Sequence, residues 1–289
     1  MNVREAMCYE AINSQTVICH LCAHQCQISD GKRGRCNVRE NRGNMLFSLN
    51  YGYAIASHVD PIEKKPIIRF LSNTSTYSFA AVGCNLTCQW CQNWEISQNQ
   101  NRDEWGYPVS PETHVRRAID YRCPSISYTY SEPTVFAEYA LDTMILAREA
   151  GLKNIWVSNG MMGPQLLDLI MPVLDAVNID LKGTKSTYHH WCKGDYDCVC
   201  RNLVRLKEAG VHVEVTTLII PSINDHPDEI STMARFIADS LGPETPWHLS
   251  RFFPAGKLYH YPITPIDTLF AARKIGLEHG LKDIILGNV

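Results

Sequence analysis

From about Tyr77 to the end of the chain, short apolar runs alternate with segments of helical periodicity. Seven of these runs are expected to form strands: residues 77–83, 125–132, 154–159, 176–183, 211–221, 246–254 and 283–289. A repeated strand-then-helix order predicts a parallel sheet with helices packed outside it. The pattern therefore indicates an α/β fold, either an open doubly wound sheet or a complete or partial (β/α) barrel.

Two of the intervening segments show the helical period most clearly. Residues 133–151 place four apolar side chains on one helix face, namely Phe136, Ala140, Met144 and Ala147. Residues 197–210 repeat the pattern, and we expect Asp197 to be the N-cap and Gly210 to end the helix.

The region before Tyr77 has a different character. It is rich in Cys, Asn, Gly and Arg and has no long periodic segment. We expect residues 1–76 to form a small, loop-dominated, Cys-rich module held together by metal, and residues 77–289 to form the core domain. No flexible linker separates the two parts, so the module is expected to pack against the core.

Composition and charge exclude several functional classes. The chain has 289 residues, of which 45% are hydrophobic, and a formal net charge of −3, so no strong field favours nucleic acid or an anionic membrane. No stretch approaches the roughly 18 apolar residues of a membrane span. We expect a cytoplasmic protein with neither nucleic acid nor membrane as a partner. In such a chain, 12 cysteines indicate metal binding or redox chemistry rather than disulfides.

Polar side chains follow several of the predicted strands. In both parallel-sheet folds, functional groups gather at the carboxyl ends of the strands. Applied here, that rule collects on one rim the loop from Cys84 to Cys91 and the pairs Ser131 and Glu132, Ser158 and Asn159, Asp180 and Lys182, and Ser250 and Arg251.

The loop GCNLTCQWCQNW, residues 83–94, carries three thiols in eight positions: Cys84, Cys88 and Cys91. Three thiolates can hold three corners of a [4Fe–4S] cluster and leave the fourth iron open for a small chelating ligand. A catalytic zinc with three cysteines and a water is the alternative. Such sites more often include a histidine, and the next one along the chain is His114.

The loop C-N-L-T-C-Q-W-C resembles the CxxxCxΦC signature of the radical S-adenosylmethionine (SAM) enzymes, with Trp90 in the aromatic position. Five further stretches resemble the branch related to pyruvate formate-lyase activating enzyme: D-P-I-E-K-K-P (60–66), Y-T-Y-S-E-P-T (128–134), S-N-G (158–160), D-L-K (180–182) and L-I-I-P-S-I-N-D (218–225). Residues 21–39, L-C-A-H-Q-C-Q-I-S-D-G-K-R-G-R-C-N-V-R, resemble the radical SAM member of the AmmeMemoRadiSam system.

This resemblance implies a partial (β/α) barrel and a [4Fe–4S] cluster bound by the three cysteines of the loop. It implies that SAM chelates the open iron and is cleaved reductively to a 5′-deoxyadenosyl radical, which abstracts hydrogen from a small-molecule or protein substrate. It places Trp90 against the adenine and Glu132 on the SAM ammonium, with Asn159, Asp180 and Lys182 around the ribose and carboxylate. An electron donor such as flavodoxin or ferredoxin is expected as a partner.

Other interpretations stay open from the sequence. The chain could be an activase that installs a glycyl radical on a partner enzyme, an iron–sulfur electron-transfer protein without chemistry of its own, or a zinc hydrolase or deaminase. Glu132 could serve only as a helix-terminal charge, and Asp180 and Lys182 could form a surface pair. Relatives tend to have R-F-H-P where this chain has R-F-F-P, with Phe253 in the histidine position, and are expected to continue beyond Val289 into a Cys-containing tail.

A second group of cysteines lies near the N-terminus: Cys19, Cys22, Cys26 and Cys36. Four thiols suit tetrahedral zinc or a second [4Fe–4S] cluster, and His20 or His24 could replace one of them. Zinc would stabilise the module, whereas a cluster would offer an electron path to the first. The nearby basic residues are expected to be solvated: Lys32, Arg33, Arg35, Arg39 and Arg42. Buried structural thiols are expected at Cys192, Cys198 and Cys200.

Overall fold

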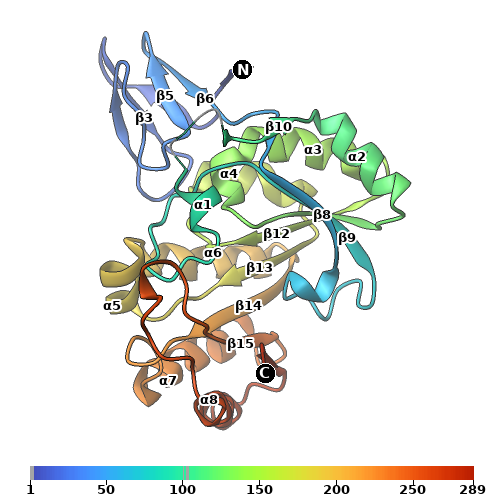
Figure 1. Ribbon diagram of the computed structural model, residues 1–289, viewed down its shortest axis with the longest axis vertical. Coiled ribbons are helices and arrows are strands. Elements are labelled where there is room, and N and C mark those ends of the chain that lie inside the picture. Colours follow the sequence, from blue (N-terminus) through green and yellow to red (C-terminus); the bar gives the residue numbers. More distant parts are fainter. Residues whose placement is uncertain (1–2, 100, 102–103) are drawn as a thin grey trace.

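The computed structural model describes residues 3–99, 101 and 104–289 (Figure 1). Its centre is an eight-stranded sheet with the strand order β16-β15-β14-β13-β12-β11-β9-β8. Seven strands run parallel: β9 (Ser75–Ala80), β11 (Ser125–Tyr128), β12 (Lys153–Ser158), β13 (Ala176–Asp180), β14 (His212–Ile219), β15 (Trp247–Arg251) and β16 (Ile284–Gly287). Each overlaps one of the seven predicted runs, so the parallel sheet is confirmed.

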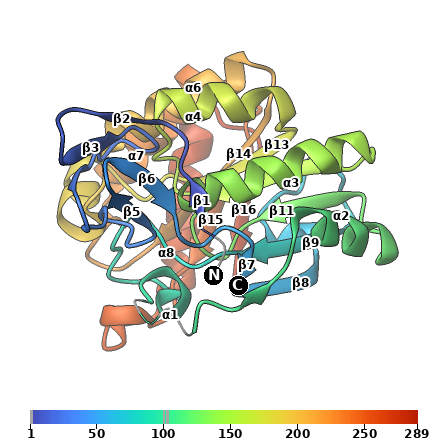
Figure 2. The same cartoon turned by 90° about the horizontal axis from the view of Figure 1, so that it is seen from above.

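The strand order never reverses along the parallel part of the sheet. Right-handed crossovers between successive neighbours therefore place the helices on one face, as Figure 2 shows for α3, α4 and α6. These helices are α2 (Pro111–Asp120), α3 (Ala137–Glu149), α4 (Pro164–Ile170), α6 (Tyr196–Glu208), α7 (Pro227–Phe236) and α8 (Ile266–Glu278). A doubly wound sheet would need a reversal. Because β16 and β8 do not pair among the described residues, the sheet is a partial barrel.

The two predicted helical faces are buried against this sheet. Phe136, Ala140, Met144 and Ala147 are fully buried beside β12, and Val199, Leu203 and Leu206 of α6 are fully buried on a helix that contacts β14. The predicted N-cap of α6 is wrong by two residues. Asp195 is the cap, because its carboxylate accepts a hydrogen bond from the backbone N–H of Cys198 at 3.1 Å. Asp197 lies in the first turn and pairs with Lys185.

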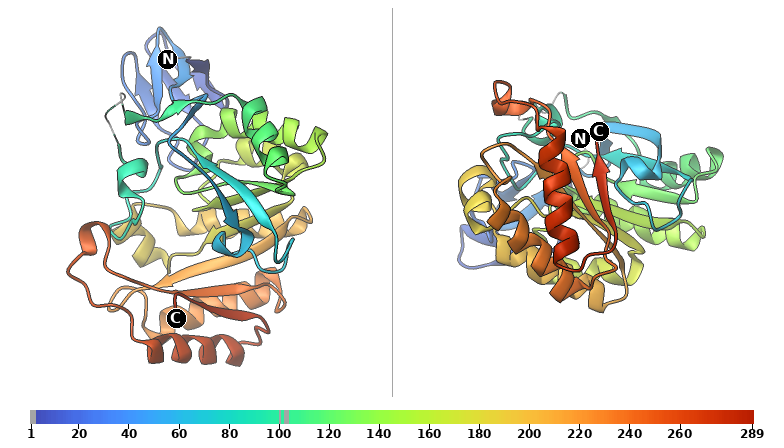
Figure 3. Two further views of the ribbon diagram at one scale, coloured as in Figure 1. Left: turned by 45° about the vertical axis from the view of Figure 1, so that its right-hand side comes forward. Right: turned by 90° about the horizontal axis from the view of Figure 1, so that it is seen from below.

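The N-terminal region contains more regular structure than its sequence indicates. One three-stranded sheet joins β1 (Arg4–Glu5), β6 (Met45–Ser48) and β5 (Arg39–Arg42), and another joins β2 (Tyr9–Ala11), β3 (Thr16–Cys19) and β4 (Gln27–Ser29). Both lie at the end of the molecule opposite α8 (Figure 3). The N-terminal region therefore has more strand than expected, because these short strands carry mixed polar residues that show no periodic pattern.

The last strand of the central sheet also comes from the N-terminal region. β8 (Ala56–Pro61) pairs antiparallel with β9 over six residues and is followed by a short 3₁₀ helix, η1 (Ile62–Lys64). A smaller pair joins β7 (Tyr53–Ala54) to β10 (Tyr107–Pro108). A division of the chain at residue 76 stays a prediction, but residues 56–61 share the sheet of the core.

A buried ion pair ties the N-terminal sheets to α3. Nη2 of Arg39 donates to both carboxylate oxygens of Glu138, at 2.7 and 2.6 Å, and the two side chains are only 1% and 3% exposed. Oε1 of Glu138 also accepts from the backbone N–H of Met7. Arg39 is therefore not part of a solvated basic loop, and that expectation is wrong for this residue.

A second buried carboxylate, Glu214 of β14, is held by four hydrogen bonds. It pairs with Nε2 of His212 at 2.9 Å and of His248 at 2.6 Å, and it accepts the backbone N–H groups of Ile68 and Arg69. Burial alone would raise the pKa of Glu214, but the hydrogen bonds from His212 and His248 outweigh it and lower that pKa to about 2.

We expect this carboxylate to make folding stability depend on pH. Because its pKa is lower in the folded state, its stabilising effect is complete above the unfolded value near 4.5 and is lost as the pH falls toward 2. The stability difference between wild type and Glu214→Gln should therefore be largest near pH 6 and shrink on acidification, as measured by urea unfolding. The exposed Glu208→Gln variant is the control and should track wild type. A wild-type-to-Glu214→Gln difference that does not change with pH would contradict this expectation.

Among the described residues, no helix combines the length and the apolar character needed to cross a membrane. Short helical segments include α1 (Trp94–Ser97), which follows the cysteine loop, and α5 (Lys185–Thr187), which leads into a π-helical turn, η5 (Tyr188–Cys192). Three more are η4 (Met171–Val173), η6 (Ile237–Leu241) and η7 (Gly256–Leu258).

Candidate active site

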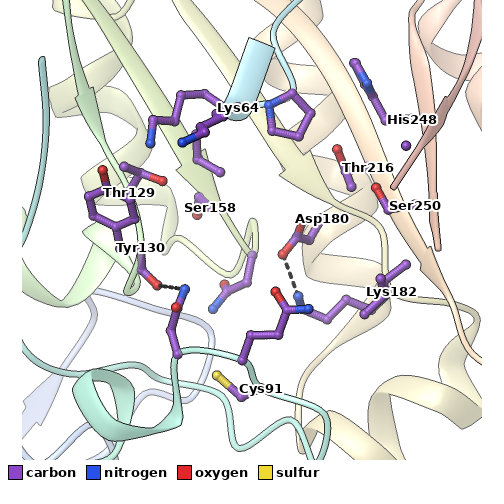
Figure 4. A pocket seen from close by; sticks show the side chains of 18 of the residues that line it. Lys64, Cys91, Thr129, Tyr130, Ser158, Asp180, Lys182, Thr216, His248 and Ser250 are labelled. Carbon is purple, nitrogen blue, oxygen red and sulfur yellow. Dashed lines mark hydrogen bonds and ion pairs between the residues drawn. The ribbon is translucent and has the colours of Figure 1, made fainter. Parts of the chain in front are cut away.

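A cavity of about 870 Å³ opens at the carboxyl ends of the parallel strands (Figure 4). Its volume lies within the range of roughly 300–1,000 Å³ that is usual for ligand sites. The structure brings to its wall all eight residues that the sequence places around cluster and SAM: Cys84, Cys88, Trp90, Cys91, Glu132, Asn159, Asp180 and Lys182. They come from the cysteine loop and from the ends of β11, β12 and β13.

The cysteine loop is fixed by backbone contacts. It begins after β9 at Gly83, whose φ of +117° suits glycine and whose Cβ, if present, would approach Val38 to 3.0 Å. Within the loop, the backbone N–H of Thr87 donates to the carbonyl of Cys192 at 3.0 Å. Because the chain on both sides is held, the three thiols have defined positions before any ligand binds.

The three thiols of the loop differ in their surroundings. Burial raises the pKa of Cys84 and of Cys91. The neighbouring Cys192 thiol lowers the pKa of Cys88, and Lys182 adds to that effect. Cys192 is buried, as expected, but it lies beside a loop thiol rather than elsewhere in the core.

The donor set fits a cluster better than a single catalytic ion. His114, the histidine that a zinc site would recruit, is fully buried between Tyr77 and Tyr139 and does not line the cavity. Three thiols spread along the wall of a large cavity suit the corners of an iron–sulfur cube.

Glu132 is the most heavily hydrogen-bonded side chain of the cavity wall. Its Oε1 accepts from the backbone N–H and hydroxyl of Thr134 and from the hydroxyl of Ser158, and its Oε2 accepts from the backbone N–H of Asn159 at 2.8 Å. It is also the N-cap of a 3₁₀ helix, η3 (Pro133–Phe136), which agrees with the helix-terminal interpretation. Burial raises its pKa, and these hydrogen bonds oppose the rise.

Asn159 connects this carboxylate to the cysteine loop. Its side-chain amide donates to Oδ1 of Asn85 at 2.7 Å and lies 3.7 Å from the sulfur of Cys84. Its carbonyl oxygen accepts from the backbone N–H of Met161. Glu132, Asn159 and Cys84 therefore form one continuous polar wall.

Asp180 and Lys182 form an ion pair of 2.6 Å at the end of β13, drawn in Figure 4. Lys182 is only 13% exposed, so the pair is not a freely solvated surface contact. Burial alone would lower the pKa of Lys182, but Asp180 and the nearby Cys88 raise it well above its usual value. Lys182 is thus a fixed positive charge beside the cysteine loop.

The cavity wall also contains residues that were not singled out at the strand ends: Asp60, Lys64, Lys65, Tyr130, Thr216 and His248. Figure 4 shows Lys64 across the cavity from Cys91. Asp60 pairs with Lys65 at 2.7 Å and accepts from the hydroxyl of Tyr130. The stretch D-P-I-E-K-K-P was a signal for this wall, but its placement depends on β8, which the sequence does not reveal.

The sixth parallel strand, β15, leads to Phe253, which stands in the position where relatives tend to have histidine. Phe253 is 40% exposed, stacks with Arg251 and does not line the cavity. His248, which lies within β15, does line it and is oriented by Glu214. The histidine at this cavity therefore comes from within β15.

Comparisons with known proteins agree with this architecture. A family model described as the radical SAM superfamily matches residues 80–237. The uncharacterized protein MJ0808 of Methanocaldococcus jannaschii is 45% identical over 288 residues, which cover 99% of this chain and 86% of that protein.

Solved structures share the fold at low sequence identity. A domain of pyruvate-formate lyase-activating enzyme from Bacteroides vulgatus aligns with a TM-score of 0.51 and 16% identity, covering 57% of this chain and 99% of that one. A radical SAM methyltransferase from Sphaerobacter thermophilus aligns with a TM-score of 0.57 and 13% identity, covering 75% and 67%. Identities this low show a common fold and nothing about substrate.

Proposed function

The chain belongs to the radical SAM superfamily, and from that premise we propose that it is an enzyme that cleaves SAM reductively. When bound, a [4Fe–4S] cluster supplies the electron that breaks a C–S bond of SAM, and the 5′-deoxyadenosyl radical so formed abstracts hydrogen from a substrate. The observation that supports this function is the presence of three cysteine thiols and four polar side chains on the wall of one cavity.

In this proposal the protein residues bind and orient. Cys84, Cys88 and Cys91 would hold the cluster. Oε2 of Glu132 accepts one hydrogen bond from protein in the structure and has a lone pair for the SAM ammonium. Lys182 offers its charge to the SAM carboxylate, and Trp90, which is 5% exposed, offers an apolar face to the adenine.

The size of the cavity supports an enzyme over a simple electron carrier. A carrier has no use for about 870 Å³ of polar-lined space beside its cluster. We propose membership of the AmmeMemoRadiSam branch from residues 21–39, and a reductant such as flavodoxin or ferredoxin. The substrate, small molecule or protein, is unidentified. The similarity to an activating enzyme is a similarity of fold alone, so a glycyl-radical partner is not part of the proposal.

The test is chromatography for 5′-deoxyadenosine after anaerobic reconstitution with iron and sulfide. We expect the product only when dithionite and SAM are both present. We also expect SAM to change the EPR spectrum of the reduced protein, which it would not do in an electron carrier. Absence of product from a protein that carries zinc and no iron would contradict the proposal and favour a zinc enzyme.

A further inference from the structure

The four N-terminal cysteines, which the proposed reaction does not use, surround a second and much smaller cavity. Cys19, Cys22, Cys26 and Cys36 all line it, and its volume is about 20 Å³. Cys19 ends β3, and its backbone N–H donates to the carbonyl of Cys26 at 3.0 Å. Thiols separated by up to 17 positions in sequence are therefore brought to one point by the small antiparallel sheets.

Three buried N–H donors of this cavity wall have no acceptor among the described residues. Two belong to Arg39, whose Nη2 is used by Glu138 while its Nε and Nη1 are without partners. The third is the side-chain amide nitrogen of Asn85, which has no acceptor at hydrogen-bond distance but interacts with the Cys22 thiol. Buried polar hydrogens are rarely left unsatisfied in folded proteins, because each one costs the free energy of its lost hydration. Their common location indicates that an acceptor belongs in the cavity.

Metal-bound thiolates are acceptors of this kind, since N–H groups commonly donate to the sulfurs of such sites. The histidines near the site do not compete as ligands. Nε2 of His24 bonds to the carbonyl of Asn85 at 2.7 Å and its Nδ1 to Arg35 at 3.1 Å, so both ring nitrogens are occupied. His20 pairs with Glu10 and does not line the cavity. The donor set is therefore four thiols.

The size of the cavity distinguishes between kinds of metal centre. A cavity of about 20 Å³ accepts one water-sized group, for which roughly 10–15 Å³ is enough. A cube of iron and sulfide ions needs far more room. The thiols are not yet gathered at the spacing of one ion, so they must turn inward on binding. Four thiolates around one small ion are the usual ligand set of structural zinc.

We propose that Cys19, Cys22, Cys26 and Cys36 bind one zinc ion as thiolates, and that Arg39 and Asn85 donate hydrogen bonds to the sulfurs. The four thiol protons leave to solvent as the metal binds. The ion stabilises the packing of the N-terminal region against the loop that follows β12. In that contact Cys22 forms an isolated antiparallel β-bridge with Met162, and the backbone N–H of Ala23 donates to the carbonyl of Met161.

The site also lies next to the proposed catalytic centre. Asn85 follows Cys84 directly, lines the small cavity, and receives the side-chain hydrogen bond of Asn159. A zinc ion there would fix the first ligand of the neighbouring cysteine loop without taking part in electron transfer.

Metal analysis of the full-length protein, purified under argon, tests the proposal. We expect about one zinc per chain, lost in Cys26→Ser and retained in Cys123→Ser. The triple variant with Ala at 84, 88 and 91 should keep its zinc, so this result does not depend on the proposed reaction. Absence of metal, or iron and sulfide in that triple variant, would overturn the zinc assignment.

Two further measurements cover the case in which Cys26→Ser fails to fold. Cobalt(II) substituted into the wild-type chain should show the visible absorption of tetrahedral thiolate coordination, and its absence would contradict the site. In chelator competition, the double variant Arg39→Met, Glu138→Met should bind zinc about 10- to 100-fold more weakly. Arg42→Met, an exposed arginine three residues away, is the control. Equal affinity in the two variants would exclude Arg39 as a donor to the sulfurs.

Discussion

Cys88→Ala is expected to lower the yield of 5′-deoxyadenosine below 1% of wild type. The thiol lies on the wall of the large cavity, and the backbone of η5 anchors its loop, so the chain around it is held in place when the sulfur is removed. Loss of a residue that only supports a metal ligand already costs about 10- to 100-fold, and loss of the ligand itself should cost more. The measurement is product per reconstituted chain with dithionite and SAM.

Cys123→Ala is the matched control for that experiment. Cys123 is a buried thiol, whereas Cys88 is half-buried, and Cys123 lies after α2 and away from both cavities. It should give wild-type yield. Iron content distinguishes two causes of a low product yield. A chain without iron has lost the cluster, whereas a chain that keeps its iron but makes no product has a defect in SAM binding. Wild-type yield from Cys88→Ala would exclude the loop as the cluster site.

The sequence predicts the core of the fold because its parallel strands lie in apolar runs separated by helical segments. All seven parallel strands and the buried face of α3 follow from apolar runs and helical periodicity. The strands that escape prediction carry mixed polar residues, as β5 does in the N-terminal sheets and β8 does on an edge of the central sheet. These strands form because they pair with segments distant in sequence. Local periodicity contains no information about such pairing.

The residues of the candidate active site likewise divide into those that the sequence places and those that it does not. Residues at strand ends could be placed on one rim, because parallel strands all end at the same edge. Lys64 could not, since it reaches the cavity on the segment that follows β8, and the sequence does not reveal the pairing of β8 with β9. The ion pair of Arg39 with Glu138 joins positions 99 residues apart and has no sequence signal at all. Sequence patterns place a functional residue on a particular helix or strand. Contacts between distant helices and strands are seen only in the structure.

Glu132→Gln is expected to weaken SAM binding by about 10- to 100-fold, because a hydrogen bond to a charged group contributes about 1.5–3 kcal/mol. The substitution also removes an acceptor from a side chain that already receives four hydrogen bonds, so the loop after β12 should lose stability. Equilibrium dialysis of SAM and thermal unfolding separate the two effects. Glu63→Gln, a more exposed carboxylate of the same cavity wall, should keep wild-type affinity. A folded Glu132→Gln chain that binds SAM as wild type does would show that this carboxylate only organises the loop and leaves the ammonium to another group.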